Sequence, residues 1–246
     1  MRSDQFILFV ALLPVVTAAF AEEAPAVPVA VVPTSAWKAN AALGYIATSG
    51  TDSRTQAFKG DMHGEWSTGN WTHEGEVLAL STRDALADSS TERYLVDTKS
   101  SRDVTAMDYL FVASQWEHDR EAGYKYQAGM NAGYGHYLLK DAVQHLSLQL
   151  GIGERHSEPE AASPENDAIG ALSLHYHYQF NAASKFTLRA SIEDGRIDRV
   201  IRTLTELKSM LNNKLAMSIC YDYKNDDSHG ATHSGITSVN LNYQFD

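Results

Sequence analysis

The sequence predicts an all-β protein, a transmembrane antiparallel up-and-down β-barrel of about twelve strands. Three observations carry this prediction: apolar and polar residues alternate from Trp37 onward, aromatic residues gather at the ends of the apolar faces, and an export signal precedes both. A period of two is typical of strands with one apolar face. The segment nearest to a helical period is 200–215, and it is not convincing.

The composition narrows the classes of function. The 246 residues include 20 Lys and Arg against 31 Asp and Glu, with a net charge of -11 and one Cys. Nucleic-acid binding is not expected, because phosphate contacts need concentrated positive charge. A single Cys excludes an intramolecular disulfide and a thiolate zinc cage. The mean hydropathy of -0.31 excludes a helical membrane bundle and by itself resembles that of a soluble protein.

The N-terminal segment is predicted to be a targeting signal and not part of the fold. Residues 1–21 have Arg2 at the positive end, an apolar core over 6–16 and a small-x-small site before Glu22, as a cleaved secretory signal peptide does. A membrane anchor is the alternative, but the apolar core is short for one and is broken by Pro14. Residues 22–36 form a Pro- and Ala-rich leader that favours an extended tether. The barrel is expected over 37–246.

The strands follow in chain order from the alternation. Strong alternation marks 55–66, 123–134, 145–152, 172–180, 185–192, 214–224 and 237–245, and weaker strands are expected at 37–48, 70–81, 92–102, 108–118 and 200–210. Each is about as long as a strand that crosses a bilayer at a tilt. Ten strands remain an alternative, because dropping a pair would preserve the parity of the connections.

The connections differ between the two ends of the predicted barrel. Short turns are expected at 67–70, 181–184 and 212–213, and longer polar loops at 82–92, 156–167 and 225–232. By the strand count, these two sets lie at opposite ends. Short turns at one end and longer loops at the other are typical of outer-membrane barrels.

Aromatic residues decide between a barrel in lipid and a soluble one, because alternation alone also describes a sandwich or a lipocalin-like barrel. Rings at strand ends, with smaller apolar residues between them, match the two interfacial girdles of a membrane barrel. The predicted girdle residues are Tyr45, Trp66, Tyr124, Tyr126, Tyr178, Phe180, Tyr221 and Tyr223. The opposite faces predict a wet, charged lumen, whose candidate residues are Lys59, Asp61, Lys125, Asn131, His175, His177, Arg189, Lys214 and Asp222.

Candidate chemistry along the chain is incomplete. His175 and His177 share a strand face, and His229 and His233 lie near two aspartates, but neither pair has a third metal ligand at a recognisable spacing. Local hydrogen bonding is the favoured interpretation, so no metal or cofactor is expected. A Gly-x-Ser-x-Gly nucleophile motif is absent. The prediction is therefore a non-enzymatic protein; an outer-membrane barrel enzyme of lipase or protease type and a soluble periplasmic binding protein are the alternatives.

Several short motifs are spread over 37–246. They are Trp37 with Gly44 and Tyr45, the Ser49-Gly50-Thr51-Asp52 turn, the 116–120 segment Trp-Glu-His-Asp-Arg, the strand from Gly129 to Gly135, and the terminal segment 240–245. In these motifs the chain resembles the salt-induced outer-membrane protein family. The turn departs from the family's Ser-Gly-Asn-Thr form. The resemblance implies an outer-membrane β-barrel of unknown molecular activity and brings no catalytic residues.

These observations lead to one functional expectation. The protein is expected in the outer membrane, in contact with lipid and lipopolysaccharide, as an envelope or salt-stress barrel and a narrow ion-permeable pore. Outer-membrane barrels resemble one another in ending on an aromatic residue that the assembly machinery recognises; here Tyr243 and Phe245 are the candidates, with Asp246 behind them. A preference for cations follows if acidic residues dominate the lumen. The sequence specifies neither the solute nor the oligomeric state.

Overall fold

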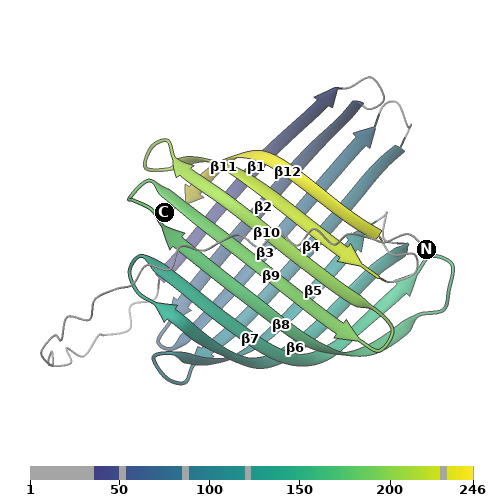
Figure 1. Cartoon of the computed structure of the whole chain (residues 1–246), viewed down its shortest axis with the longest axis horizontal. Coiled ribbons are helices and arrows are strands. Elements are labelled where there is room, and N and C mark those ends of the chain that lie inside the picture. Colours follow the sequence, from purple (N-terminus) through teal and green to yellow (C-terminus); the bar gives the residue numbers. More distant parts are fainter. Residues whose placement is uncertain (1–35, 50–53, 85–88, 120–122, 228–231, 246) are drawn as a thin grey trace, which may run out of the picture. The chain divides into compact units, whose positions relative to one another are not determined.

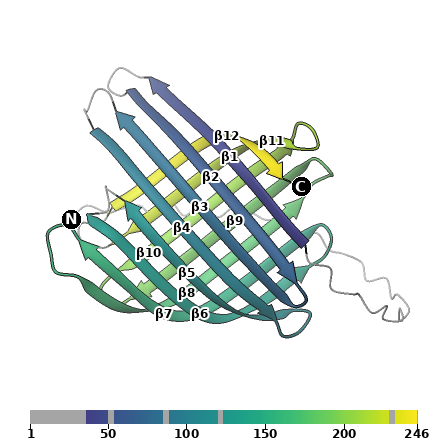
Figure 2. The same cartoon turned by 180° about the vertical axis from the view of Figure 1, so that it is seen from behind.

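The computed structural model describes residues 36–49, 54–84, 89–119, 123–227 and 232–245. The predicted signal peptide and almost all of the predicted leader lie outside them. The described residues form twelve antiparallel strands in one closed barrel, in which each strand pairs with its neighbours in the chain and β1 pairs with β12 (Figures 1 and 2). This confirms the predicted fold and the count of twelve. Among these residues no helix is long and apolar enough to cross a membrane.

The strands are long for a globular protein. Their bounds are β1 (Ala36–Ser49), β2 (Arg54–Thr68), β3 (Trp71–Asp84), β4 (Ser89–Asp103), β5 (Asp108–Asp119), β6 (Tyr124–Lys140), β7 (Gln144–Pro159), β8 (Glu165–Gln179), β9 (Ser184–Gly195), β10 (Arg199–Met210), β11 (Leu215–Asp226) and β12 (Thr232–Phe245). We call the end with the connections β2–β3, β4–β5, β6–β7, β8–β9 and β10–β11 the turn end, and the opposite end the loop end.

The connections at the loop end are shorter than the sequence predicts. The predicted loops 82–92, 156–167 and 225–232 fall at the same end of the barrel, but strand structure occupies part of each. β3 continues to Asp84 and β4 begins at Ser89, while β7 continues to Pro159 and β8 begins at Glu165. Polar side chains do not end these strands, because a paired neighbour satisfies the backbone hydrogen bonds whichever side chains are present.

A side-chain oxygen holds each of the longer turns at the turn end. Asp141 Oδ1 accepts hydrogen bonds from the backbone N–H groups of Val143 and Gln144, both at 2.8 Å. These two bonds lower the pKa of the Asp141 carboxyl, and the bond from Val143 contributes most. The side-chain oxygens of Thr105, Asn181 and Asn212 accept in the same way, each from the backbone N–H groups two and three residues later in the chain. This is the Asx- or ST-turn, which explains why these residue types punctuate the strands.

The barrel closes through a short seam. β1 pairs with β12 only from Ala39 opposite Phe245 to Tyr45 opposite Val239, whereas β1 pairs with β2 along its whole length. At the other edge of these hairpins, Arg93 is the last residue of β4 that pairs with β5, and β4 extends past it toward the loop end. The hairpins β1–β2 and β3–β4 therefore stand out past their neighbours at the loop end, as the purple and blue strands in Figure 1 show.

The two faces of the wall have opposite chemistry. Apolar side chains cover the outer face, among them Leu150, Ile152 and Leu241, which are 59%, 79% and 52% exposed. Polar side chains are buried inside, among them Gln149 and Asn242. An exposed apolar surface that runs around a whole molecule marks contact with lipid. This arrangement excludes the soluble barrel, in which the apolar face would point inward.

Candidate functional site

An ion pair crosses the lumen at mid-depth. Arg189 on β9 binds Glu76 on β3 with two parallel bonds, Nη1 to Oε2 at 2.6 Å and Nη2 to Oε1 at 3.1 Å. The two strands are six positions apart in the twelve-strand ring, so the pair spans the diameter. A bidentate arginine–carboxylate pair has fixed geometry as well as strength. The pair therefore holds a defined position in the centre of the lumen.

A second set of charges crosses the lumen nearer the loop end. Its centre is Glu117 on β5, whose side chain is completely buried. Oε1 accepts from Arg93 Nε at 2.6 Å and from Lys224 Nζ at 3.0 Å, and Oε2 accepts from Arg202 Nη2 at 2.9 Å. Lys224 also donates to the Tyr124 hydroxyl at 2.7 Å. We call these five residues the Glu117 network; it joins β4, β5 and β6 to β10 and β11.

A third set of bonds lies beside the Glu117 network on the β7–β10 wall. Arg155 Nη1 donates to Glu193 Oε2 at 3.1 Å, and Nη2 donates to the carboxylate of Asp198 in the β9–β10 connection. Asp167 accepts from the backbone N–H of Ile197 at 2.8 Å. These bonds attach the β9–β10 connection to the inner wall, so this connection covers part of the loop end.

Two cavities remain between these bonds. One, of about 550 Å³, lies toward the turn end, and the other, of about 280 Å³, lies between it and the Glu117 network. Arg189 and Glu76 line both, so their pair stands where the two cavities meet. Charges in the larger cavity are balanced: six carboxylates (Asp61, Glu65, Glu74, Glu76, Asp103, Glu206) face six basic side chains (Lys38, Lys59, Lys99, Lys185, Arg189, Lys208).

Most of the residues predicted for the lumen line these cavities. The larger cavity is lined by Lys59, Asp61, His175, His177 and Arg189. The smaller one is lined by Asn131 and Asp222, and again by His175 and Arg189.

Two of the predicted lumen residues lie elsewhere. Lys125 is on the outer face, where its Nζ lies 3.3 Å from Glu158 Oε1 and its side chain is 60% exposed. Lys214 lies in the exposed turn between β10 and β11 and not on a strand. Both predictions were wrong because they extended the alternation of a strand beyond the point where its register or its ladder ends.

The prediction of Tyr124 as a girdle residue is also wrong. The cause is the same irregularity that turns Lys125 outward. The register of β6 against β7 shifts between Tyr124 and Tyr126, and that of β5 against β6 shifts between Glu117 and Asp119. A shift of one residue moves a side chain to the other face of the sheet. Tyr124 is therefore buried in the lumen, 1% exposed, where it serves the Glu117 network.

The other predicted rings occupy two levels of the outer face. Trp66, Tyr178 and Phe180 lie near the turn end, while Tyr45, Tyr126, Tyr221 and Tyr223 lie in the loop-end half. Tyr243 and Phe245 lie exposed on the outer face of β12, 40% and 47%, with their ring centroids 5.0 Å apart. Further exposed rings that the sequence analysis did not assign to the girdle are Trp37, Trp71, Tyr94 and Trp116.

The sequence analysis also missed the residues that bridge the lumen. Glu76, Glu117, Arg202 and Lys224 stand on polar strand faces, but three of them lie in segments whose alternation is weak, 70–81, 108–118 and 200–210. A signal was present: each is a charged residue within a strand of a membrane barrel, where the lumen face is favoured for charged side chains. Its partner lies on a strand remote in the chain, and local patterns do not contain that information.

The chain matches the family described as "Protein of unknown function, DUF481" over residues 41–245. The chain belongs to this family. A relative, the uncharacterized protein YdiY of Escherichia coli (strain K12), is 28% identical over 188 residues, which cover 76% of this chain and 73% of YdiY. Belonging to the DUF481 family agrees with the resemblance to outer-membrane barrels of unknown activity that the sequence predicts. Neither description names a catalytic activity.

Solved outer-membrane barrels share the fold of this DUF481 chain. The NanC porin superposes with a TM-score of 0.52 at 10% identity, over 86% of this chain and all of the porin (100%). The COG4313 outer membrane channel of Pseudomonas putida F1 also gives 0.52 at 10% identity, over 87% and 97% of the two chains. Similarity at this level of identity establishes the architecture, an outer-membrane type of β-barrel.

Proposed function

We propose that the protein is a narrow ion-permeable pore of the outer membrane that takes part in the response of the envelope to salt. One observation carries this proposal: a polar lumen with two cavities is interrupted at mid-depth by the Arg189–Glu76 pair. A barrel of twelve strands has little room beyond its own side chains. The pair therefore limits passage to water and small ions.

The exposure of the central pair connects the pore to salt. The side chain of Arg189 is 41% exposed to the lumen, and that of Glu76 is 12% exposed. Dissolved ions screen charges that water reaches, with a Debye length that falls from about 10 Å at 0.1 M to about 3 Å at 1 M. High salt is expected to weaken the pair, so conductance should rise more steeply than the conductivity of the solution. The balanced charges of the larger cavity favour weak selectivity and not a strong cation preference.

An enzyme of lipase type is less well supported. The contact that most resembles a serine nucleophile with its histidine base joins His73 Nδ1 and Ser100 Oγ, which lie 2.9 Å apart on the outer face. The His73 ring stacks on Trp66 and Trp71, and within the described residues no carboxylate or amide contacts it. A nucleophile and its base need a third group to orient the base. We therefore do not propose a hydrolase.

Planar-bilayer recording tests the pore. We expect the wild-type protein to give small, steady conductance, and the double variant Arg189→Gln with Glu76→Gln to give a larger one, because the pair is replaced by two uncharged side chains. The matched control is Arg199→Gln, which removes an exposed pair with Asp194 at the loop end, 2.7 Å long, outside the lumen lining. It should conduct like the wild type. Silence of both the wild type and the double variant at all voltages would refute the proposal.

A further inference from the structure

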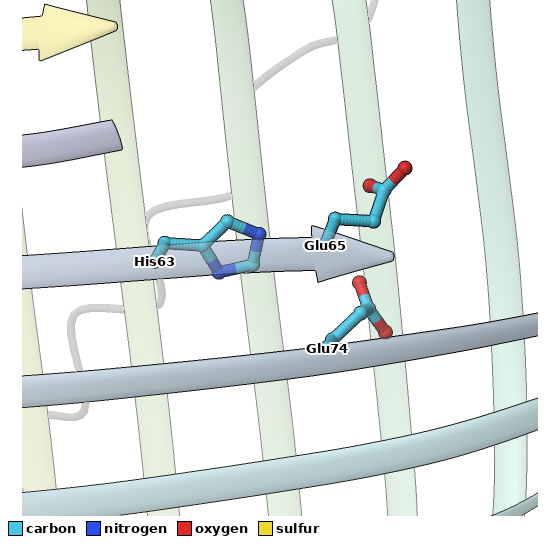
Figure 3. A group of neighbouring side chains, drawn as sticks. All are labelled: His63, Glu65 and Glu74. Carbon is cyan, nitrogen blue, oxygen red and sulfur yellow. The ribbon is translucent and has the colours of Figure 1, made fainter. Parts of the chain in front are cut away.

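Three lumen side chains from two neighbouring strands converge in the larger cavity. They are His63 and Glu65 on β2 and Glu74 on β3, and one nitrogen or oxygen of each lies within 4.8 Å of those of the other two. Figure 3 shows His63 and Glu65 along one strand and Glu74 on the strand beside it, with the three side chains near one another. Strand pairing explains the arrangement, since His63 and Glu65 share a face at i and i+2, and Glu74 is the register partner of Glu65.

A fourth side chain, outside the group whose atoms lie within 4.8 Å of one another, lines the same cavities from the opposite wall. His175 on β8 lines both cavities together with His63 and Glu74. Within the described part of the chain, His175 has no hydrogen-bond partner, whereas the neighbouring His177 lies 3.3 Å from Thr187 Oγ1. The His175 ring is half-buried and lines both cavities, so its nitrogens are open to a ligand in the lumen.

We propose that His63, Glu65, Glu74 and His175 bind one divalent cation of the first transition row, with Zn²⁺ as its representative. Two imidazoles and two carboxylates form a mixed nitrogen and oxygen set, with bonds of about 2.0–2.2 Å for zinc. Imidazole ligands favour such metals, whereas Ca²⁺ and Mg²⁺ are bound by oxygen alone. The sequence offers His175 and His177 without a third ligand; the closed barrel supplies the missing ligands from β2 and β3.

Two lysines are the present counter-ions of the carboxylates. Lys99 Nζ lies 2.6 Å from Glu74 Oε2, and Lys38 Nζ lies 3.1 Å from Glu65 Oε1. Each ammonium group contacts one oxygen and leaves the other oxygen of the carboxylate for a metal. A bound cation has to compete with Lys99 for the charge of Glu74. Removal of the Lys99 charge should therefore strengthen the binding.

Isothermal titration of the full-length protein in detergent with Zn²⁺ tests the site, with Ca²⁺ as the comparison. We expect about one Zn²⁺ per barrel in the wild type. The His63→Ala, Glu74→Gln double variant should bind at least tenfold more weakly because it loses two ligands. Lys99→Gln should bind more tightly. His145→Ala removes another imidazole of the same cavity and should bind like the wild type. Heat-modifiable gel migration of each variant checks that the barrel has folded.

Two outcomes would overturn the site. One is the absence of Zn²⁺ binding in both the wild type and Lys99→Gln. The other is binding that the double variant retains unchanged, since the ion would then sit on other histidines. Binding does not depend on conduction, so this result stands apart from that of the bilayer recordings.

Discussion

Lys224 and Glu117 form an ion pair across the full width of the barrel, with 3.0 Å between Nζ and Oε1. The residues are 107 positions apart in the chain and lie on β11 and β5, on opposite sides of the ring. Arg93 and Arg202 bind the same carboxylate. One buried anion is thus shared by three cations, each of which also lies within 4.0 Å of another carboxylate.

Removal of this anion is expected to destabilise the barrel. Glu117→Ala removes the carboxylate that three buried cations share, and breaking a buried ion pair in this way costs about 3–5 kcal/mol of unfolding free energy. Glu158→Ala is the control, because its pair with the exposed Lys125 is worth at most about 1 kcal/mol. Urea unfolding in lipid vesicles, followed by gel migration, measures both. Equal losses in the two variants would contradict a central role for Glu117.

A charge on the outer face tests the contact with lipid. Leu150 is 59% exposed at the middle of β7, and Leu150→Arg should cost about 2–4 kcal/mol of unfolding free energy in vesicles, as arginine does at the bilayer midplane. Leu150→Met keeps the apolar surface and serves as the control. On a water-facing wall the same arginine would change stability by about 0.5 kcal/mol or less, and that result would be incompatible with a lipid-facing wall.

Two glycines of β6 make a matched test of close packing. A Cβ added at Gly133 would collide with the carbonyl oxygen of Leu150 on β7, whereas one at Gly129 would lie 3.8 Å from the nearest atom, Glu154 O. Gly133→Ala should therefore cost about 1–3 kcal/mol, as overpacking does. Gly129→Ala should be neutral or stabilising by up to about 1 kcal/mol, because alanine loses less entropy on folding. Urea unfolding of both variants gives the comparison, and the reverse order would contradict the register of β6 on β7.

The turn at Asp141 predicts an acid-sensitive contribution to stability. Its carboxyl pKa is lowered in the folded protein, so the ionised form stabilises the turn above the unfolded pKa of about 3.9 and the contribution disappears as pH falls through the lower, folded value. Asp141→Asn keeps the acceptor and removes the titration. The wild type should therefore gain unfolding free energy relative to Asp141→Asn as pH rises from about 2 to about 5.

The matched control for Asp141 is the turn at Asn181, which has the same hydrogen bonds without a charge. Asn181→Asp should introduce the same dependence on pH. Parallel curves of stability against pH for the wild type and Asp141→Asn would show that the carboxylate does not act in this way.

The architecture could be predicted from the sequence because its cause is local. Lipid outside and water inside impose a period of two on every strand, and this pattern is visible even in the weaker segments such as 92–102. The turns could be predicted for the same reason, since Asn181 and Asn212 act on N–H groups two and three residues ahead. Both kinds of signal lie within a few residues of one another.

The lumen could be predicted only in part, because its contacts depend on register and closure. Arg189 could be placed inside from its strand face, but its partner Glu76 is 113 residues away in the chain. The bulge near Tyr124 reverses a face without any mark in the residue pattern. His175 comes to line the same cavities as Glu74 only when the ring has closed.

The ion pairs that cross the lumen also give the barrel a mechanical property. Arg189–Glu76 at mid-depth and Lys224–Glu117 nearer the loop end act as struts between opposite walls. A bare cylinder of strands can flatten or widen by bending its wall while every backbone hydrogen bond survives. Here any such deformation has to pull these struts apart. The stiffness of the cross-section under membrane tension is therefore set by a few side chains in its interior and not by the wall alone.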